Sequence, residues 1–248
     1  MTLGFAACGL ASYPVVLADA LQESAQHWTP AVYLPQLLEG ASVTILITVL
    51  SFLLAVALGL PIALMRLYAP APFRWLAIGY VEFFRGIPVL LLLFFLYFGL
   101  PVFAQQVGLP WSLRLEPLHA AILGFGLNYA AYEAEIYRAG ISAIPLGQWE
   151  AAASLSMPHR LTFRRIILPQ AIRIILPPMT NDFIALFKDT SIVSIIAVEE
   201  LSKKYQILAK SSLKYMEIGL ATALLYLVMS VPLGYLSRCL EKRWSNAA

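Results

Sequence analysis

The stretch from Gly40 to Met65 holds 26 consecutive residues without a charge. A helix rises about 1.5 Å per residue, so a run of this length can cross the hydrocarbon core of a bilayer. Within lipid, backbone N–H and C=O groups must be satisfied inside the element, and a helix of this length achieves that. This segment therefore predicts an integral membrane protein built from α-helices.

Further apolar runs follow the first. With 60% hydrophobic and 12% charged residues, and a mean hydropathy of +0.76, the chain is too apolar for a water-soluble domain. We therefore expect an all-α integral membrane protein with about five transmembrane helices. The expected spans are residues 40–65, 75–104 with a kink at Pro88, 117–137, 166–187 and 218–237.

The fourth expected span is the least regular. It contains Pro169, the pair Pro177-Pro178, and the polar neighbours Asn181 and Asp182. Ionisable groups at membrane depth normally face a cavity or a partner, and broken helices are tolerated where their backbone lines such a cavity. We therefore expect a broken helix beside a polar path. Asn181 and Asp182 are candidates for that path, and hydrogen bonding between helices is the alternative.

Two pairs of opposite charges stand three residues apart in expected helices. They are Glu82 with Arg85 and Glu135 with Arg138. Residues at this spacing lie close enough on a helix to form ion pairs. We interpret both pairs as structural, and a role in the polar path or at a partner contact is the alternative for Glu82 and Arg85.

A charged stretch separates the third and fourth spans. It reads Glu150-Ala-Ala-Ala-Ser-Leu-Ser156, then Met157-Pro158, and ends with Ile166-Ile-Leu-Pro169. Proline ends one helix and suits the first turn of the next. The stretch predicts two short helices at an angle, exposed between spans, to which another protein could bind. An ordinary basic loop is the alternative.

The order of these residues resembles the EAA loop of binding-protein-dependent ABC importer permeases. The flanking segments 138–150, 168–173 and 187–191 are similar to the polar amino acid permeases of the histidine/glutamate/glutamine/arginine type. The resemblance covers about residues 38–243 and implies a type I ABC importer permease (MetI-like) core. Ser156 stands where the family usually has Gly. If the bend needs a positive φ, a side chain there costs on the order of 1 kcal/mol.

The resemblance implies a mechanism and a set of partners. A cytosolic ABC ATPase dimer would dock on the loop at about 148–169 and drive alternating access. The other partners would be a second permease subunit, identical or paralogous, an extracytoplasmic substrate-binding protein, a polar amino acid as substrate, and the lipid bilayer. The residues expected to couple to the ATPase are Glu150, Ala151, Ala152, Leu155, Ser156 and Met157.

Several kinds of chemistry have no motif in the sequence. There is no P-loop, so ATP and Mg are expected on the partner ATPase, with no cofactor or catalytic residue in this chain. The histidines are too scattered for a metal site, and no basic patch interleaved with aromatic residues indicates nucleic acid. Two other functions remain as alternatives: an ATP-independent secondary carrier or channel component for small polar solutes, and a membrane-embedded enzyme.

The distribution of cations predicts the orientation. With five spans, ten Lys and Arg residues fall on one face and six on the other, and residues 1–39 contain none. The positive-inside rule then places the N-terminus outside and the C-terminus in the cytoplasm of a bacterial cytoplasmic (inner) membrane. We expect a variable extracytoplasmic leader at 1–37, a transmembrane domain at 38–243 and a cytoplasmic tail at 244–248.

Overall fold

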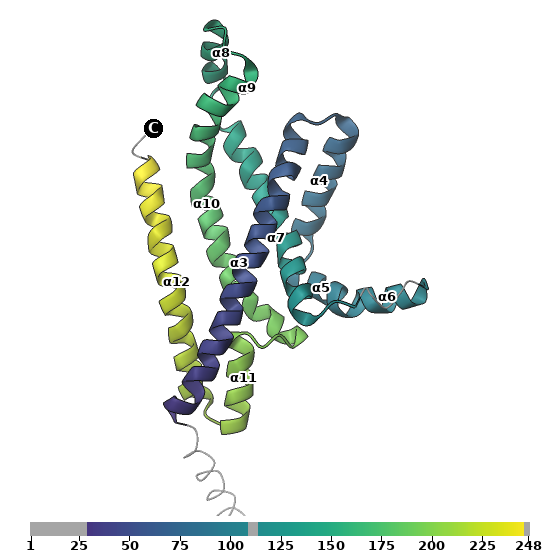
Figure 1. Cartoon of the computed structure of the whole chain (residues 1–248), viewed down its shortest axis with the longest axis vertical. Coiled ribbons are helices and arrows are strands. Elements are labelled where there is room, and N and C mark those ends of the chain that lie inside the picture. Colours follow the sequence, from purple (N-terminus) through teal and green to yellow (C-terminus); the bar gives the residue numbers. More distant parts are fainter. Residues whose placement is uncertain (1–28, 109–113, 246–248) are drawn as a thin grey trace, which may run out of the picture.

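The computed structural model describes residues 29–108 and 114–245, and every regular element in these ranges is a helix (Figure 1). The predicted all-α architecture is therefore confirmed for this part of the chain. Three helical segments in it are long and apolar enough to cross a membrane: Pro30–Tyr68, Val89–Gln106 and Tyr215–Cys239. Two further helices, α7 (Pro117–Ser142) and α10 (Leu168–Asp189), have 26 and 22 residues but are more polar. Four of these five segments correspond to predicted spans, and Val89–Gln106 covers only the second half of the span predicted at 75–104.

The first long helix, α3 (Pro30–Tyr68), is longer than the span predicted for it. Proline has a fixed φ that suits the first helical turn, which agrees with the start at Pro30. At the other end Ala69 is extended because it precedes Pro70. Residues 30–37, predicted as part of the leader, therefore belong to this helix, and residues 1–28 lie outside the described ranges.

The central contact of the fold joins α3 to α7, which run in the same direction. Small buried residues line it: Ala55, Gly59 and Ala63 on α3, and Gly126, Ala130 and Ala134 on α7. A methyl group added at Gly59 would lie 3.1 Å from both the Ala130 carbonyl oxygen and the Ala134 backbone nitrogen. Small residues let membrane helices approach at backbone distance, and more than half of the residues of α7 are buried as a result.

The second predicted span differs from the expectation of one kinked helix. The chain forms α4 (Ala71–Gly86), which packs on α3 and α7, and then α5 (Val89–Phe94), a π-helix (Phe95–Gly99) and α6 (Leu100–Gln106). Ile87 is extended with φ −103°, as expected for a residue before proline. The chain therefore turns at Pro88, and α5 and α6 cross the direction of α3 and α7 (Figure 1).

The fourth span is not broken at Pro177-Pro178, so that expectation was wrong. Helix α10 continues through both prolines, and it packs against α7 on one side and α12 (Tyr215–Ser245) on another. Neighbouring helices can stabilise a membrane helix that lacks some of its own hydrogen bonds. The irregular backbone lies earlier, in the π-helix Phe163–Ile167 that leads from α9 (His159–Thr162) into α10.

A short 3-10 helix (Thr190–Ile196) and α11 (Leu201–Ser212) connect α10 to α12 at the end of the molecule opposite α8 (Leu146–Ser154) (Figure 1). The buried Glu200 carboxylate accepts the backbone N–H groups of Ser202 and Lys203, both at 2.8 Å, and the Tyr226 hydroxyl of α12 at 3.1 Å. Burial raises the pKa of Glu200 to about 6, and these hydrogen bonds oppose that rise. Glu200 thereby attaches α11 to α12.

The close approach of α3 to α7 generates a stability prediction. We expect Gly59→Ala to lower the free energy of unfolding by about 1–3 kcal/mol, because the new methyl group would press on the backbone of α7. Gly79→Ala in α4 is the matched control, since nothing lies within 4 Å of its added methyl group. Thermal unfolding of the purified protein in detergent compares the two, and equal melting temperatures would contradict this account of the contact.

Candidate functional site

Helices α8 and α9 extend beyond the ends of the other helices, at the same end of the molecule as the last turns of α12 (Figure 1). We call residues 146–162 the α8–α9 projection. The Trp149 ring stacks on the His159 imidazole with centroids 4.7 Å apart, and on the Phe163 ring at 6.5 Å. The side chain of Ala152 is buried between the helices. These contacts hold α8 at a defined angle to the start of α10.

The bend between α8 and α9 is a helix-ending turn with Ser156 in the left-handed region, at φ 55°. The Ser156 N–H donates to the Ala153 carbonyl at 2.8 Å, and the Met157 N–H donates to the Ala152 carbonyl at 3.1 Å. This hydrogen-bond pattern is the Schellman motif, in which glycine is the favoured residue at the left-handed position. The bend therefore does need a positive φ, and Ser156 is strained relative to Gly.

The outer surface of the projection is unusually apolar for an exposed connection. Leu146 and Leu155 are each 76% exposed, while Glu150 and Ala151 are exposed beside them. A cavity of about 510 Å³ lies between the projection and the end of α3. It is lined by Tyr68, Leu146, Trp149, Ala153, Met157, His159 and Thr162. Exposed apolar side chains around a hollow are typical of a surface that binds another protein.

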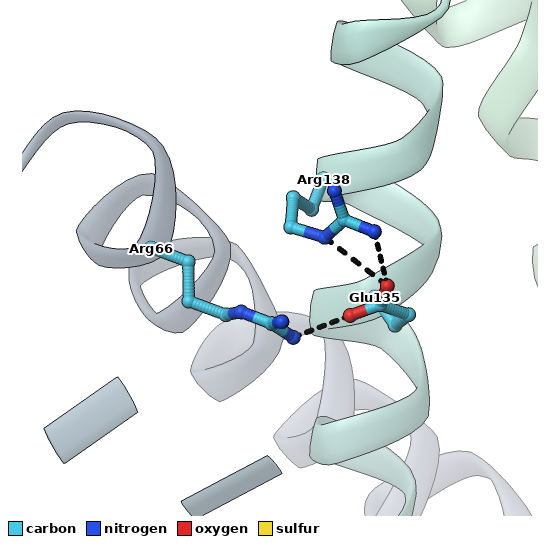
Figure 2. Close-up of polar contacts among 3 residues, drawn as sticks. All are labelled: Arg66, Glu135 and Arg138. Atoms are coloured by element: carbon cyan, nitrogen blue, oxygen red, sulfur yellow. Dashed lines mark hydrogen bonds and ion pairs between the residues drawn. The ribbon is translucent and has the colours of Figure 1, made fainter. Parts of the chain in front are cut away.

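Glu135 of α7 lies between two guanidinium groups (Figure 2). One carboxylate oxygen pairs with Arg138 on the same helix, and the other pairs with Arg66 at the end of α3. The sequence indicated the contact with Arg138. The contact with Arg66 joins residues that are 69 positions apart, so no local spacing rule could indicate it. The network connects the ends of α3 and α7 next to the α8–α9 projection.

The predicted ion pair between Glu82 and Arg85 does not form. Both side chains are exposed, and the Arg85 guanidinium lies 5.3 Å from the centre of the Tyr132 ring of α7. A cation over an aromatic face is attracted by the ring, and this contact takes Arg85 toward α7 instead of Glu82. The helical spacing was right for a pair, but packing against α7 decided the partner.

A second cavity, of about 450 Å³, lies where α4, α7 and α10 meet, and we call it the central cavity. Its polar lining consists of Arg85, Asn128, Tyr129, Tyr132, Asp182 and Asp189. The Tyr129 hydroxyl donates to Asp189 at 2.8 Å, whereas the buried Oδ2 of Asp182 has no hydrogen-bond partner. Asp182 is half-buried and lines the cavity, so the accessible part of its carboxyl group can meet a ligand there.

The two candidates for the polar path separate in the structure. Adjacent residues on a helix point about 100° apart, so Asn181 and Asp182 cannot face the same neighbour. Asn181 Oδ1 accepts the Ser237 hydroxyl of α12 at 3.1 Å, which is a contact between helices, while Asp182 lines the central cavity. Tyr129 and Tyr132 were not predicted, because only the packing of α7 beside α4 and α10 brings them to the cavity. Within the described ranges, no group of three metal-ligating side chains could hold a metal ion.

The chain matches known proteins over most of its length. The family model described as "binding-protein-dependent transport system inner membrane component" matches residues 55–246. The probable amino-acid ABC transporter permease YckA of Bacillus subtilis (strain 168) is 40% identical over 86% of this chain and 90% of its own. The L-cystine transport system permease TcyB of the same organism is 38% identical over 84% and 86%.

Solved structures give the same assignment. A crystal structure of an amino acid ABC transporter with histidines is 36% identical, with a TM-score of 0.77, covering 85% of this chain and 95% of that one. The MetNI methionine ABC transporter, in an inward-facing conformation, is 19% identical with a TM-score of 0.65 over 86% and 99%, which shows the fold alone.

The strained bend generates a prediction for the projection. We expect Ser156→Gly to stabilise the protein by about 1 kcal/mol, because glycine adopts a positive φ without steric cost. Ser156→Val should destabilise it by more than Ser156→Gly gains, since a β-branched residue is a pronounced outlier at this φ. Melting temperatures of the three proteins test the order, and a lower value for the glycine variant would contradict it.

Proposed function

The chain belongs to the family of inner membrane components of binding-protein-dependent transport systems, and we propose that the α8–α9 projection is the docking site for its ATPase. As a permease subunit of an amino acid ABC importer, the chain forms the membrane passage. The observation that carries the proposal is the exposed apolar surface around Leu146 and Leu155, with the adjoining cavity of about 510 Å³. A partner side chain that entered this cavity would bury apolar surface on both proteins.

The projection is suited to transmitting a displacement. The stacking of Trp149 on His159 and the hydrogen-bonded turn at Ser156 stiffen it, and α9 continues through the π-helix into α10. Movement of the projection would therefore move α10, which carries Asp182 at the central cavity. This continuity supports alternating access driven from the projection.

The remaining partners follow from the family. ATP and Mg would bind on the ATPase dimer, because the chain has no P-loop. An extracytoplasmic binding protein would deliver the substrate, and a second permease, identical or paralogous, would complete the passage. In this arrangement the projection and the C-terminus face the cytoplasm, and α11 and the N-terminus face outward, as the distribution of cations favours.

The central cavity is lined by one positive and by negative side chains, which match the carboxylate and ammonium groups of an amino acid. Arg85 can meet the substrate carboxylate and the Asp182 carboxylate can meet its ammonium group, with Tyr129 and Tyr132 beside them. Charge-assisted hydrogen bonds are stronger than neutral ones, and they are stronger still away from bulk water. We therefore assign the central cavity as the substrate passage, and we assign Asn181 to the contact between α10 and α12.

Docking is tested by replacing residues 146–154 with a flexible Gly-Ser tract of equal length. We expect the ATPase to be lost from the purified complex while the amount of membrane-inserted permease stays unchanged, because only the projection is altered. Gly79→Ala, which meets no neighbouring atom, should retain the ATPase in full. Retention of the ATPase and of amino acid uptake by the Gly-Ser variant would reject the docking site.

The passage is tested by comparing Asp182→Asn with Asn181→Ala. A hydrogen bond to a charged group is worth about 1.5–3 kcal/mol, so Asp182→Asn should lower uptake by roughly tenfold or more. Asn181→Ala removes the hydrogen bond to Ser237 and should lower thermal stability, with uptake per folded molecule preserved. Unchanged uptake by Asp182→Asn, with normal insertion and ATPase binding, would remove Asp182 from the passage.

A further inference from the structure

Glu133 is a fully buried carboxyl group that the proposed transport mechanism does not use. Its exposed fraction is 0%, and neither carboxylate oxygen has a hydrogen-bond partner. Helix α3 covers it directly, because a methyl group added at Gly59 would lie 2.8 Å from the Glu133 Cβ. A side chain with this chemistry is unexpected at the closest contact between two membrane helices.

The polar groups around Glu133 do not supply a counter-charge. On α7, the buried Tyr137 hydroxyl lies one turn farther along, near enough to interact with the Glu133 carboxyl group, although the two form no hydrogen bond of ordinary geometry. On α10, Asp182 is near enough for its charge to act on Glu133. On α3 the nearest neighbour is Gly59, and Arg66, farther along that helix, pairs with Glu135. Within the described ranges, no Lys, Arg or His forms an ion pair with Glu133.

An ionised carboxylate is expensive at such a position. Burying an unpaired charge away from water is strongly unfavourable, and a second carboxylate nearby adds repulsion. A proton bound to Glu133 removes both costs, because the neutral carboxyl group has no charge to bury and none to be repelled by Asp182. We propose that Glu133, with Tyr137 and Asp182 beside it, forms a buried proton-binding site that is occupied while α3 packs on α7.

The site couples protonation to the packing of α3 on α7. The packed state binds the proton more tightly than any state in which water reaches Glu133, so a rise in pH favours separation of the two helices. If alternating access parts these helices, as the proposed function allows, each cycle would release and rebind this proton. The proton site itself rests on the packing alone and stands whether or not the ATPase docks on the α8–α9 projection.

The test compares the purified full-length chain with Glu133→Gln, which keeps the shape of the side chain but cannot ionise. Melting temperatures are measured from mildly acidic to mildly basic pH, in sodium and in choline buffers. We expect wild type to lose stability as the pH rises, and Glu133→Gln to show a smaller loss and to exceed wild type at the basic end. Glu82→Gln, at an exposed carboxyl group, should follow wild type. Glu200 titrates in wild type and in every variant, so its contribution cancels when the pH profile of a variant is subtracted from that of wild type.

Two further measurements distinguish a bound proton at Glu133 from a bound metal cation. Infrared spectra should show the C=O stretching band of a protonated carboxylic acid in wild type and its loss in Glu133→Gln. Asp182→Asn removes the neighbouring carboxylate, so the fall in stability should end at a lower pH and should be smaller than in wild type. A pH profile of Glu133→Gln equal to that of wild type, or an unchanged infrared band, would overturn the proposal. Dependence of wild-type stability on sodium instead of pH would overturn it in favour of a metal-cation site.

Discussion

The backbone-distance contact between α3 and α7 positions every other functional part of this permease. Lipid tails are as apolar as leucine, so membrane helices gain little from burying large apolar side chains, and close packing becomes the main source of association. Gly59, Ala130 and Ala134 permit that packing. Because α7 is held inside, it can carry Asn128, Tyr129 and Glu133, which a helix facing lipid could not.

Two carboxyl groups of α7 show how strongly local surroundings determine charge. Glu133 and Glu135 are two residues apart and point in different directions from the same helix. Glu135 meets Arg66 and Arg138 near the projection, where it connects the ends of two helices (Figure 2). Glu133 packs beneath α3 within electrostatic range of Asp182, and it forms no ion pair in the described part of the chain. Glu135 therefore forms ion pairs that connect α3 to α7, whereas Glu133 is suited to gaining and losing a proton.

The route from the α8–α9 projection to the central cavity is a continuous helical path. The π-helix at Phe163–Ile167 changes the helical winding between α9 and α10, and the backbone stays helical from His159 to Asp189. It lies next to the stack of Trp149 on Phe163, so the stiffest part of the projection joins α10 directly. A displacement at one end can therefore reach Asp182 without a flexible segment between them.

The sequence by itself determined the class of protein, most of the spans, the presence of a break at Pro88 and the two short helices around Ser156, because these depend on local properties of the chain. Long charge-free runs indicate membrane spans, and a residue before proline favours an extended backbone. The order of residues around Glu150 carries the family resemblance. The cost of a side chain at Ser156 is local as well, since it depends on the φ of that residue alone.

The tertiary structure decided everything that depends on a distant neighbour. Packing against α7 and α12 kept α10 helical through Pro177-Pro178, and the ring of Tyr132 drew Arg85 away from Glu82. Asn181 faces α12 and Asp182 faces the central cavity, although the two are adjacent in sequence. The burial of Glu133 beneath Gly59 joins two helices that are far apart along the chain. Such contacts depend on which faces of two helices pack together. The spacing of residues along a single helix does not reveal that pairing.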